Sequence, residues 1–459
     1  MANRILKSVL LGAIAAVIGA PLFGAPPAAP ATYVLSAASW GPAQDALVAK
    51  AGGTLTFRHA GSGLAVAESS STTFVSDVQR DGTIRAALDQ VVQWVPPTQT
   101  FELPEDAVTP GDETFVNLQW NIKAVHAPEA WAATGFTGLG VRVAVVDGGL
   151  YNSHIDLNGH VDVAHSASFV PPFAFNEDVG TFWHATHVAG IIAALDNGIG
   201  TIGIAPDATI VGVKVLHNGS GSFAAVIQGI LYSADSIADG GAGADIINMS
   251  LGALFPRGGG NTGAGLLVAA MASAVNYATA HNVLVVSAAG NDAVDLDHSG
   301  SFISVPAESG SGLAIAATGP VGYAVGYPNG NQDFSTPASY TNFGRSAIWV
   351  AAPGGNDELP GNAVCSIPRV PSGSVTTACF VFDFVISPGR GSGASISTYF
   401  FAEGTSMAAP AAAGVAALVK QRFPGISVGD LKTYLAKTAD LKGPFLGHGF
   451  VNALRAVTE

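Results

Sequence analysis

The chain has 459 residues, of which 48% are hydrophobic and 11% charged, and its formal net charge at pH 7 is −14. This length and apolar content suit a large buried core and exclude a disordered chain, which would be rich in charge and poor in apolar residues. The negative charge argues against a nucleic-acid partner, because phosphates are neutralised by Lys and Arg.

The first 31 residues have the pattern of a secretory signal peptide. Arg4 and Lys7 precede an apolar run at 9–20, which is too short to span a bilayer as a helix. Ala29-Pro30-Ala31 forms a small-x-small cleavage site, so Thr32 is the expected first residue after cleavage. Cleavage would give a secreted protein that is free of the membrane. The alternative that the same criteria leave open is an uncleaved membrane anchor.

Residues 32–98 predict a small ferredoxin-like α+β domain. The predicted order is β-α-β-β-α-β, with strands at 33–35, 54–57, 63–67 and 91–95 and helices at 42–51 and 77–89. A stretch rich in Pro and acidic residues follows, and residues 99–114 are predicted to be a linker. A position between a signal and a linker favours a removable pro-segment over a permanent N-terminal domain.

The main domain, 115–459, alternates apolar strands with helices. The predicted strands are 141–146, 209–215, 245–251 and 283–288, and the predicted helices are 184–195, 223–239, 266–281 and 408–419. This alternation predicts an α/β fold, with a mostly parallel sheet and helices on both faces. In such sheets, sites form beyond the carboxyl ends of the strands.

Polar residues follow the ends of several of these elements. Asp147 comes directly after a strand, where a buried carboxylate is costly unless it is paired. His184 and His187 lie on one helix face, but the helical zinc signature has histidines four apart, so one base and one structural histidine is the better interpretation. Asn291 also follows a strand. Asp147 and Asn291 each have a plain alternative as a turn residue.

Ser406 begins a helix after a glycine turn, and Pro410 is expected in the first helical turn, where its missing N–H is tolerated. The positive end of the helix favours negative charge near the hydroxyl. A serine here is either an N-cap or a nucleophile, which also requires a base, an orienting acid and an oxyanion donor. The presence of Asp147, His184 and Asn291 in the same domain favours the nucleophile.

The stretches around these residues resemble the subtilisin-like serine proteases, or subtilases. The resemblance covers roughly residues 115–459 and rests on the sequences at 143–149, 184–190, 203–206, 248–252, 288–291 and 404–410. The leader at 32–98 is similar to subtilase pro-segments, which assist folding and inhibit the enzyme. The fold expected from the resemblance is therefore subtilisin-like, preceded by an inhibitor-like domain.

The resemblance implies a role for each candidate catalytic residue. Ser406 would be the nucleophile, and His184 would take its proton and later give it to the leaving amine. Asp147 would hold the imidazole in the required tautomer. Asn291 and the backbone N–H of Ser406 would form the oxyanion hole.

The resemblance also implies where the substrate binds. Ser250, Leu251 and Gly252 would pair with an extended substrate backbone. That segment and a second one would wall the pocket for the residue before the cleaved bond; the second segment is Ala288, Ala289 and Gly290. Both walls are small, apolar and free of acidic residues, so we expect large apolar side chains to be preferred over Arg or Lys. Ser304 is the candidate for the base of this pocket.

A structural calcium site is implied by the loop at 195–201. The expected ligands are carbonyl oxygens of the loop, the side-chain amide of Asn197 and a carboxylate nine residues past Asp147, which is the kind of oxygen set that Ca²⁺ prefers. The expected ligand residues are Asp156, Leu195, Asn197, Ile199 and Thr201. The alternative is a plain surface loop with Asp156 in solvent.

The chain departs from the family pattern in three places. Gly148 stands where Ser or Thr is usual, and Ala185 where Gly is usual. The segment at 355–397 is longer than in compact relatives and contains Cys365 and Cys379. Export favours a disulfide between them over two free thiols. The segment is expected to form a stapled flap over the side of the cleft that holds residues after the cleaved bond.

These observations favour a secreted serine endopeptidase that is made as a zymogen and cuts off its own leader. Its expected partners are protein or peptide substrates and the leader itself as intramolecular inhibitor, and a monomer is expected. Two alternatives are a protease dedicated to processing one partner and a catalytically silent relative that binds proteins.

Overall fold

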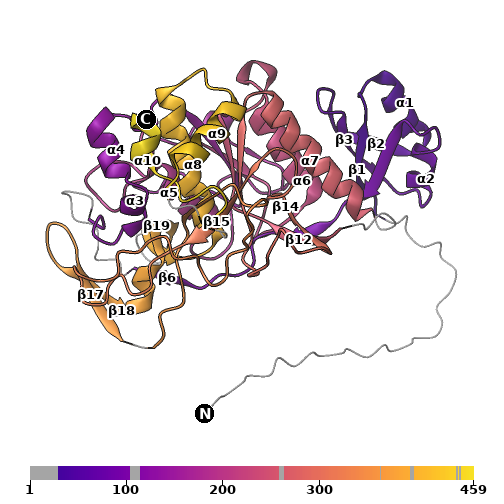
Figure 1. The fold of residues 1–459 in the computed structure, drawn as a ribbon. Coiled ribbons are helices and arrows are strands. Elements are labelled where there is room, and N and C mark those ends of the chain that lie inside the picture. Colours follow the sequence, from indigo (N-terminus) through magenta and orange to yellow (C-terminus); the bar gives the residue numbers. More distant parts are fainter. Residues whose placement is uncertain are drawn as a thin grey trace, which may run out of the picture.

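The computed structural model describes residues 29–103, 114–257, 263–361, 363–392, 397–440, 443 and 446–459. Residues 1–28 of the expected signal peptide and most of the expected linker lie outside these ranges. The chain forms a small leader domain beside a larger domain that contains the C-terminus (Figure 1). Within the described ranges, none of the helices combines the length and hydrophobicity that a membrane crossing requires.

A seven-stranded parallel sheet lies at the centre of the larger domain, with the order β16-β15-β13-β11-β7-β9-β8. Its strands are β7 (Arg142–Asp147), β8 (Ala167–Ser168), β9 (Thr209–Lys214), β11 (Ile246–Met249), β13 (Leu284–Ala288), β15 (Leu313–Thr318) and β16 (Val350–Pro353). The predicted parallel α/β fold is therefore confirmed.

Helices cover both faces of this sheet because its central strands are apolar on both sides. Along β7, Val143 and Val145 pack into one core cluster and Ala144 and Val146 into the other, since side chains alternate along a strand. The first cluster includes α5 (His184–Ala193) and α8 (Thr405–Arg422), and the second includes α6 (Phe223–Ala234) and α7 (Ala264–Ala280). The predicted helices at 184–195 and 223–239 end a few residues early.

The remaining elements of the larger domain surround this core. The helices are α3 (Trp120–Ala124), α4 (Ala127–Thr134), α9 (Val428–Thr438) and α10 (Ala453–Thr458), with short 3₁₀ turns at Val163–His165, Ile237–Asp239 and Cys379–Asp383. The strands outside the central sheet are β10 (Ser220–Ser222), β12 (Ala253–Pro256), β14 (Phe302–Val305), β17 (Val364–Pro368), β18 (Ser374–Ala378), β19 (Val385–Arg390) and β20 (Ser397–Ala402).

The leader domain is a four-stranded antiparallel sheet with the order β2-β3-β1-β4. Its elements are β1 (Ala31–Ala37), α1 (Pro42–Lys50), β2 (Gly53–His59), β3 (Leu64–Ser69), α2 (Phe74–Val78) and β4 (Ile84–Leu88). This is the expected β-α-β-β-α-β arrangement.

Two predictions within the leader were wrong. The predicted helix at 77–89 is instead the short helix α2 followed by strand β4, because Gly82 turns the chain with a φ of 76°. The predicted last strand at 91–95 does not join the leader sheet. Its first residues form β5 (Val91–Gln93), which pairs antiparallel with β10 of the larger domain.

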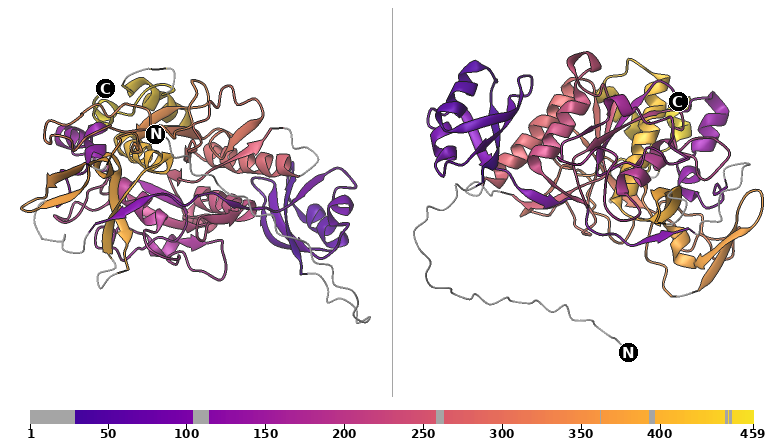
Figure 2. Two further views of the ribbon diagram at one scale, coloured as in Figure 1. Left: turned by 90° about the horizontal axis from the view of Figure 1, so that it is seen from below. Right: turned by 180° about the vertical axis from the view of Figure 1, so that it is seen from behind.

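The leader sheet packs on α6 and α7 (Figure 2). Val34 and Val66 of the leader belong to the same apolar cluster as these two helices. At the edge of this contact, His59 pairs with Asp235 at 3.1 Å and meets the Tyr277 ring edge-on. The leader is thus held to the larger domain by apolar packing with a polar rim.

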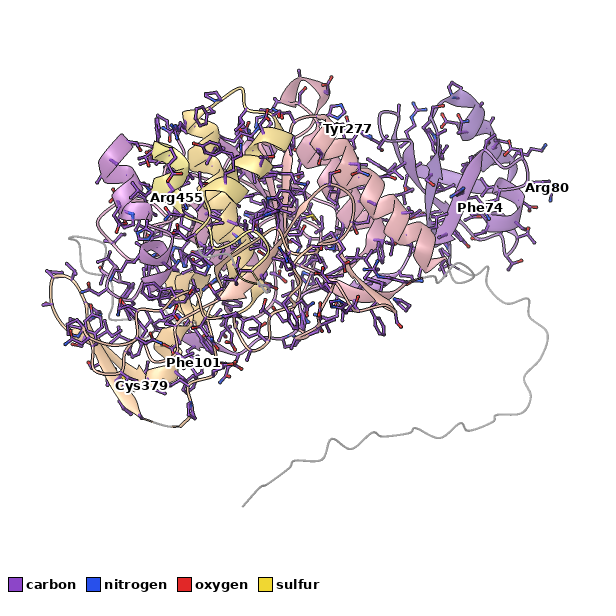
Figure 3. All side chains as sticks on the ribbon, viewed as in Figure 1. Phe74, Arg80, Phe101, Tyr277, Cys379 and Arg455 are labelled. Carbon is purple, nitrogen blue, oxygen red and sulfur yellow. A yellow bond between two sulfur atoms is a disulfide. The ribbon has the colours of Figure 1, made fainter. Side chains whose placement is uncertain are left out.

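The expected linker at 99–114 also contains regular structure. Strand β6 (Thr100–Glu102) pairs antiparallel with β20, so part of the linker prediction was wrong. Next to β6 stands the hairpin of β17 and β18, which lies within the long segment at 355–397. Cys365 and Cys379 form a disulfide across this hairpin, at the end of the molecule remote from the leader domain (Figure 3).

Candidate active site

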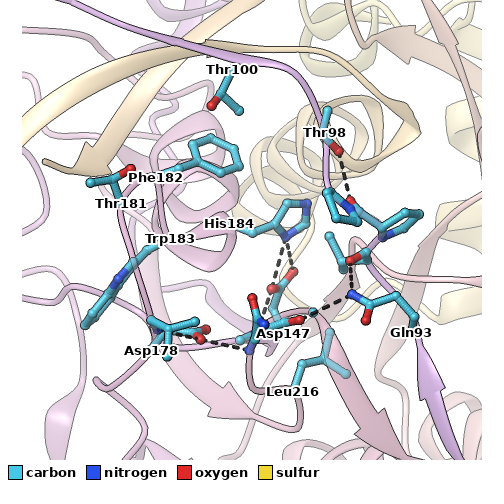
Figure 4. A pocket seen from close by; sticks show the side chains of 17 residues that line it. Gln93, Thr98, Thr100, Asp147, Asp178, Thr181, Phe182, Trp183, His184 and Leu216 are labelled. Carbon is cyan, nitrogen blue, oxygen red and sulfur yellow. Dashed lines mark hydrogen bonds and ion pairs between the residues drawn. The ribbon is translucent and has the colours of Figure 1, made fainter.

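Asp147 and His184 form a close pair where β7 ends and α5 begins. Asp147 is the last residue of β7 and is 1% exposed. Its two carboxylate oxygens accept from His184 Nδ1 at 3.0 and 2.9 Å. The pairing fixes a proton on Nδ1, so Nε2 is left as the basic nitrogen that faces the cleft (Figure 4).

His187 has a different environment on the same helix. Its side chain is fully buried, and Nε2 bonds to the carbonyl of Phe400 at 2.9 Å. Burial lowers the pKa of His187 to about 3, so this ring is neutral in the folded protein. The predicted division between one base and one structural histidine agrees with this geometry.

Ser406 is the second residue of α8 and is partly exposed. Its Oγ donates to the Ser250 carbonyl at 3.1 Å, and the Ser250 hydroxyl donates to the Ser406 carbonyl at 2.7 Å. No hydrogen bond among the described residues joins Ser406 to His184. Catalytic hydrogen bonds are often long before substrate binds.

Pro410 lies deeper in the helix than predicted. Because α8 already begins at Thr405, the proline falls after the first turn. A proline has no N–H for the carbonyl four residues earlier, which here belongs to Ser406. That carbonyl accepts the Ser250 hydroxyl instead. The helix defect therefore ties the turn of Ser406 to the end of β11.

Asn291 lies just past β13, beside the same turn. Its Oδ1 accepts from the backbone N and the hydroxyl of Thr405 at 2.9 and 2.8 Å, which directs its Nδ2 elsewhere. A Cβ built on Gly404 would lie 3.3 Å from that Nδ2 and 3.6 Å from the backbone N of Ser406. Two N–H donors therefore flank one small space that the glycine leaves open, as an oxyanion hole requires.

The two predicted pocket walls meet beside this space. A Cβ on Gly252 would lie 3.4 Å from the Val305 carbonyl and 3.7 Å from the Ala288 carbonyl. Ser304 donates through its hydroxyl to the carbonyl of Ala289 at 2.9 Å. The structure thus brings 250–252, 288–290 and Ser304 together.

The end of the leader occupies the adjacent cleft, which sequence reasoning missed. Trp94 accepts from the N–H of Gly252 at 3.0 Å and donates its own N–H to Gly219 at 2.9 Å. Its ring is 1% exposed, packs on Phe223 and Phe255, and donates to Gly221. The apolar run at 91–95 does predict a strand, but this strand pairs with β10 and not with the leader sheet.

Beyond Trp94 the chain passes over the Asp147–His184 pair. A cavity of about 260 Å³ lies between Val95, Pro96, Pro97, Thr98 and Thr100 on one side and residues of the larger domain on the other (Figure 4). The lining on the second side includes Asp147, Trp183, His184 and Leu216. The chain between β5 and β6 therefore lies over the Asp147–His184 pair.

Asp178 explains the departure at Gly148. A Cβ on Gly148 would lie 2.5 Å from Asp178 Oδ2, which accepts from the N–H of Gly149 at 2.8 Å. Lys214 is fully buried, with its ammonium 3.7 Å from the same carboxylate, and burial lowers its pKa against the opposing effect of Asp178. Asp178 and Lys214 thus lie beside Gly148, where the family usually has the hydroxyl of Ser or Thr. Sequence reasoning missed both.

The loop at 195–201 has oxygen donors that fit a calcium ion. Among the described residues, the carbonyl oxygens of Leu195, Ile199 and Thr201 accept no hydrogen bond. Asn197 is hydrogen-bonded to the carboxylate of Asp156 at 3.2 Å, which places the two side chains together. The N–H and hydroxyl of Thr201 also donate to Asp156, but burial outweighs these bonds and raises the pKa of this carboxylate to about 7. Carbonyl, amide and carboxylate oxygens are the ligand types that Ca²⁺ takes.

The fold and this arrangement of residues define a class, the serine hydrolases built on a parallel α/β sheet. A model of the subtilase family matches residues 138–452. Subtilisin Savinase of Lederbergia lenta is 36% identical over 340 residues, which are 73% of this chain and 97% of the relative. The chain belongs to the subtilase family and is a subtilisin-like serine endopeptidase.

Solved structures show the same fold. A protease from Pseudoalteromonas arctica is 28% identical with a TM-score of 0.56, covering 76% of this chain and 99% of that one. The epidermin leader peptide processing serine protease of Staphylococcus aureus has a TM-score of 0.69 at 17% identity, covering 94% of this chain and all of that one. The second match extends over the leader domain as well.

Proposed function

We propose that this subtilase is a secreted endopeptidase made as a zymogen, with residues 32–98 as its intramolecular inhibitor. The observation that carries the proposal is the path of the leader. Its last strand pairs with β10 and its Trp94 carbonyl accepts from Gly252, so it lies as an extended substrate would. The residues that follow, 95–98, line the cavity beside Asp147 and His184.

The proposed chemistry uses the four predicted residues. Ser406 Oγ attacks the carbonyl carbon of the scissile bond while His184 Nε2 takes the hydroxyl proton, and Asp147 stabilises the imidazolium through Nδ1–H. The oxygen of the tetrahedral intermediate takes the negative charge and accepts from Asn291 Nδ2 and the N–H of Ser406. His184 then gives its proton to the leaving amine, and water hydrolyses the acyl-enzyme by the same route.

The proposed specificity follows from the pocket walls. Gly252, Ala288 and Ala289 leave space and offer no charge, which suits a large apolar residue before the cleaved bond.

A structural Ca²⁺ held by Asp156, Asn197 and the carbonyls of Leu195, Ile199 and Thr201 is part of the proposal. The ion would fasten the loop that interrupts the chain after α5, and it would take no part in the chemistry.

N-terminal sequencing and mass measurement of the exported protein test this proposal, with wild type beside Ser406→Ala. We expect the wild type to begin beyond about residue 96 and the variant to keep its leader. If both keep the leader, the catalytic proposal loses its main support, and the alternative of a catalytically silent binding protein is favoured. If both lose it, another protease removes the leader, and activity is then tested directly on a peptide.

A panel of unrelated proteins separates a degradative role from a processing role. Cleavage of many unfolded substrates at apolar residues is the expected result. Cleavage of a single protein would favour the processing alternative, which the fold shared with the epidermin leader protease makes worth testing.

A further inference from the structure

Strand β6 is a second segment of the chain that lies on the larger domain, where it pairs with the edge of β20. Thr100, Phe101 and Glu102 pair with Ala402, Phe401 and Phe400, and Leu103 donates its N–H to the Tyr399 carbonyl at 2.9 Å. In the sheet β19-β20-β6, the strand β20 has two neighbours only while residues 100–102 lie on it. After a cut between β5 and β6, release of residues 100–102 from β20 would leave an unpaired edge, which readily takes another extended strand.

Along the chain, β5 precedes the residues that lie over Asp147 and His184, and the segment on this edge follows them. The chain runs from β5 past Thr98, which lines the cavity at His184, and then onto β20. β20 itself ends at Ala402, four residues before Ser406. In the direction of the chain, β20 therefore holds residues that follow those lining the cavity at His184.

The hairpin of β17 and β18 and the 3₁₀ turn that follows it lie against this edge, and the turn brings two aromatic rings to it. The ring of Phe101 meets Phe380 at 5.6 Å and Phe384 at 5.8 Å between ring centroids. A cavity of about 370 Å³ continues from it, lined in part by Leu103, Val375, Val381 and Phe401. The hairpin and the 3₁₀ turn that carries Phe380 are joined by the Cys365–Cys379 disulfide. Phe101 and Cys379 lie at the same end of the molecule (Figure 3).

We infer that β20 and the disulfide-bonded hairpin form a binding site for an extended stretch of protein substrate on the carboxyl side of the cleaved bond, with a pocket for an aromatic side chain where Phe101 now lies. The inference rests on the proposed function. It assigns to the long insertion a preference for substrates that carry an aromatic residue a few positions after the cut. The leader and the residues after it would then mimic substrate on both sides of Ser406.

Internally quenched peptides test this inference with the mature enzyme. One series keeps a fixed apolar sequence before the cleaved bond and moves a single Phe through six positions after it, with Ala elsewhere. A matched short series ends in an amide directly after the first of these positions. We expect one position of Phe to raise kcat/KM roughly tenfold over the all-Ala peptide, as an aromatic contact in a partly buried pocket gives.

Variants connect the preference to the hairpin. The quantity to compare is kcat/KM of the best long peptide divided by kcat/KM of the short peptide. Phe380→Ala is expected to lower this ratio to about the value that the all-Ala long peptide gives. Phe423→Ala, a partly exposed phenylalanine at the end of α8, is the matched control and should keep the ratio. Cys365→Ser with Cys379→Ser frees the hairpin from its disulfide and is expected to lower the same ratio.

The outcomes separate the inference from the proposed function. If no peptide is cut, the proposed function fails. If all peptides are cut with no dependence on the position of Phe, the binding site is not there, or residues 100–103 remain on β20 after maturation, and either result overturns the inference. A ratio that stays unchanged in both hairpin variants overturns it as well.

Discussion

The turn of Ser406 depends on two residues that have no catalytic atoms. Gly404 has a φ of 142° and leaves the space that Asn291 Nδ2 and the N–H of Ser406 flank. Pro410 leaves the Ser406 carbonyl without a helical partner, and Ser250 takes it. The serine thereby gains fixed contacts to the strand segment that is proposed to hold the substrate.

The contribution of Asn291 can be measured at the same scale. Asn291→Ala should lower kcat by roughly 10²–10³-fold with little change in KM, because the lost donor acts on the transition state. Thr405→Val removes a hydroxyl that Asn291 Oδ1 accepts and keeps the side-chain shape, so it should cost much less. A change confined to KM in Asn291→Ala would contradict the oxyanion role.

Glu403, two residues before the turn at Thr405, should make stability depend on pH. Burial, with the charge of Asp357 in second place, raises its pKa from 4.5 to about 8. The folded state then binds a proton that the unfolded state has released between these values, so the free energy of unfolding falls as pH rises from about 4.5 to about 8. Tm of Glu403→Gln should decline less than wild type between pH 5 and 8. Glu358→Gln, an exposed acid next to Asp357, should follow wild type.

At the scale of elements, short segments take their structure from the surface on which they lie. Residues 84–88 form a strand because β1 offers an edge and Ile84, Ala86 and Ala87 can be buried there. β5 and β6 each have only three residues, too few to form a stable strand alone. Each is a strand because an edge of the larger domain faces it.

The loop after α5 gives a prediction on metal removal. A chelator should lower the Tm of the wild type, since an ion present at 100 times its Kd stabilises the folded state by about 2.7 kcal/mol. Asp156→Asn should reduce this sensitivity, and Asp196→Asn, an exposed neighbour in the loop, should keep it. Calcium, and not magnesium, should restore the wild-type Tm, because Mg²⁺ demands a smaller octahedral site. A Tm that does not respond to the chelator would rule out a stabilising ion.

At the scale of the whole molecule, the leader is bound at two separate surfaces. Its sheet packs on α6 and α7, and its last residues lie in the cleft. The two attachments lie on one continuous chain, so each raises the effective concentration of the other. Cutting the chain between β5 and β6 would remove that advantage and allow the leader to dissociate.

Trp94 is expected to determine how long the leader stays bound to the larger domain. Trp94→Ala removes a buried ring and should weaken binding of the leader by roughly 3 kcal/mol, or about 10²-fold. The lag before peptidase activity appears in a purified precursor should shorten accordingly. Val91→Ala, in the same segment but 75% exposed, should leave the lag as in wild type. An unchanged lag in Trp94→Ala would show that the sheet contact alone holds the leader.

The sequence alone determined the class of fold and which residues to examine. Apolar strands alternating with helices predict a parallel sheet because burial on both faces requires it, and Asp147, His184, Asn291 and Ser406 each follow the end of a strand or begin a helix. Number and spacing allowed a disulfide or two free thiols, the expected export favoured the disulfide, and the structure pairs Cys365 with Cys379.

Only the tertiary structure decided where the short strands belong and what surrounds the site. The path of 91–102 through the cleft depends on edges supplied by β10 and β20, which are more than a hundred residues away. Asp178 and Lys214 meet behind Gly148 because separate strands and loops converge there. Local sequence carries no signal for such contacts, since pairing between distant segments is set by the packed core and not by propensity.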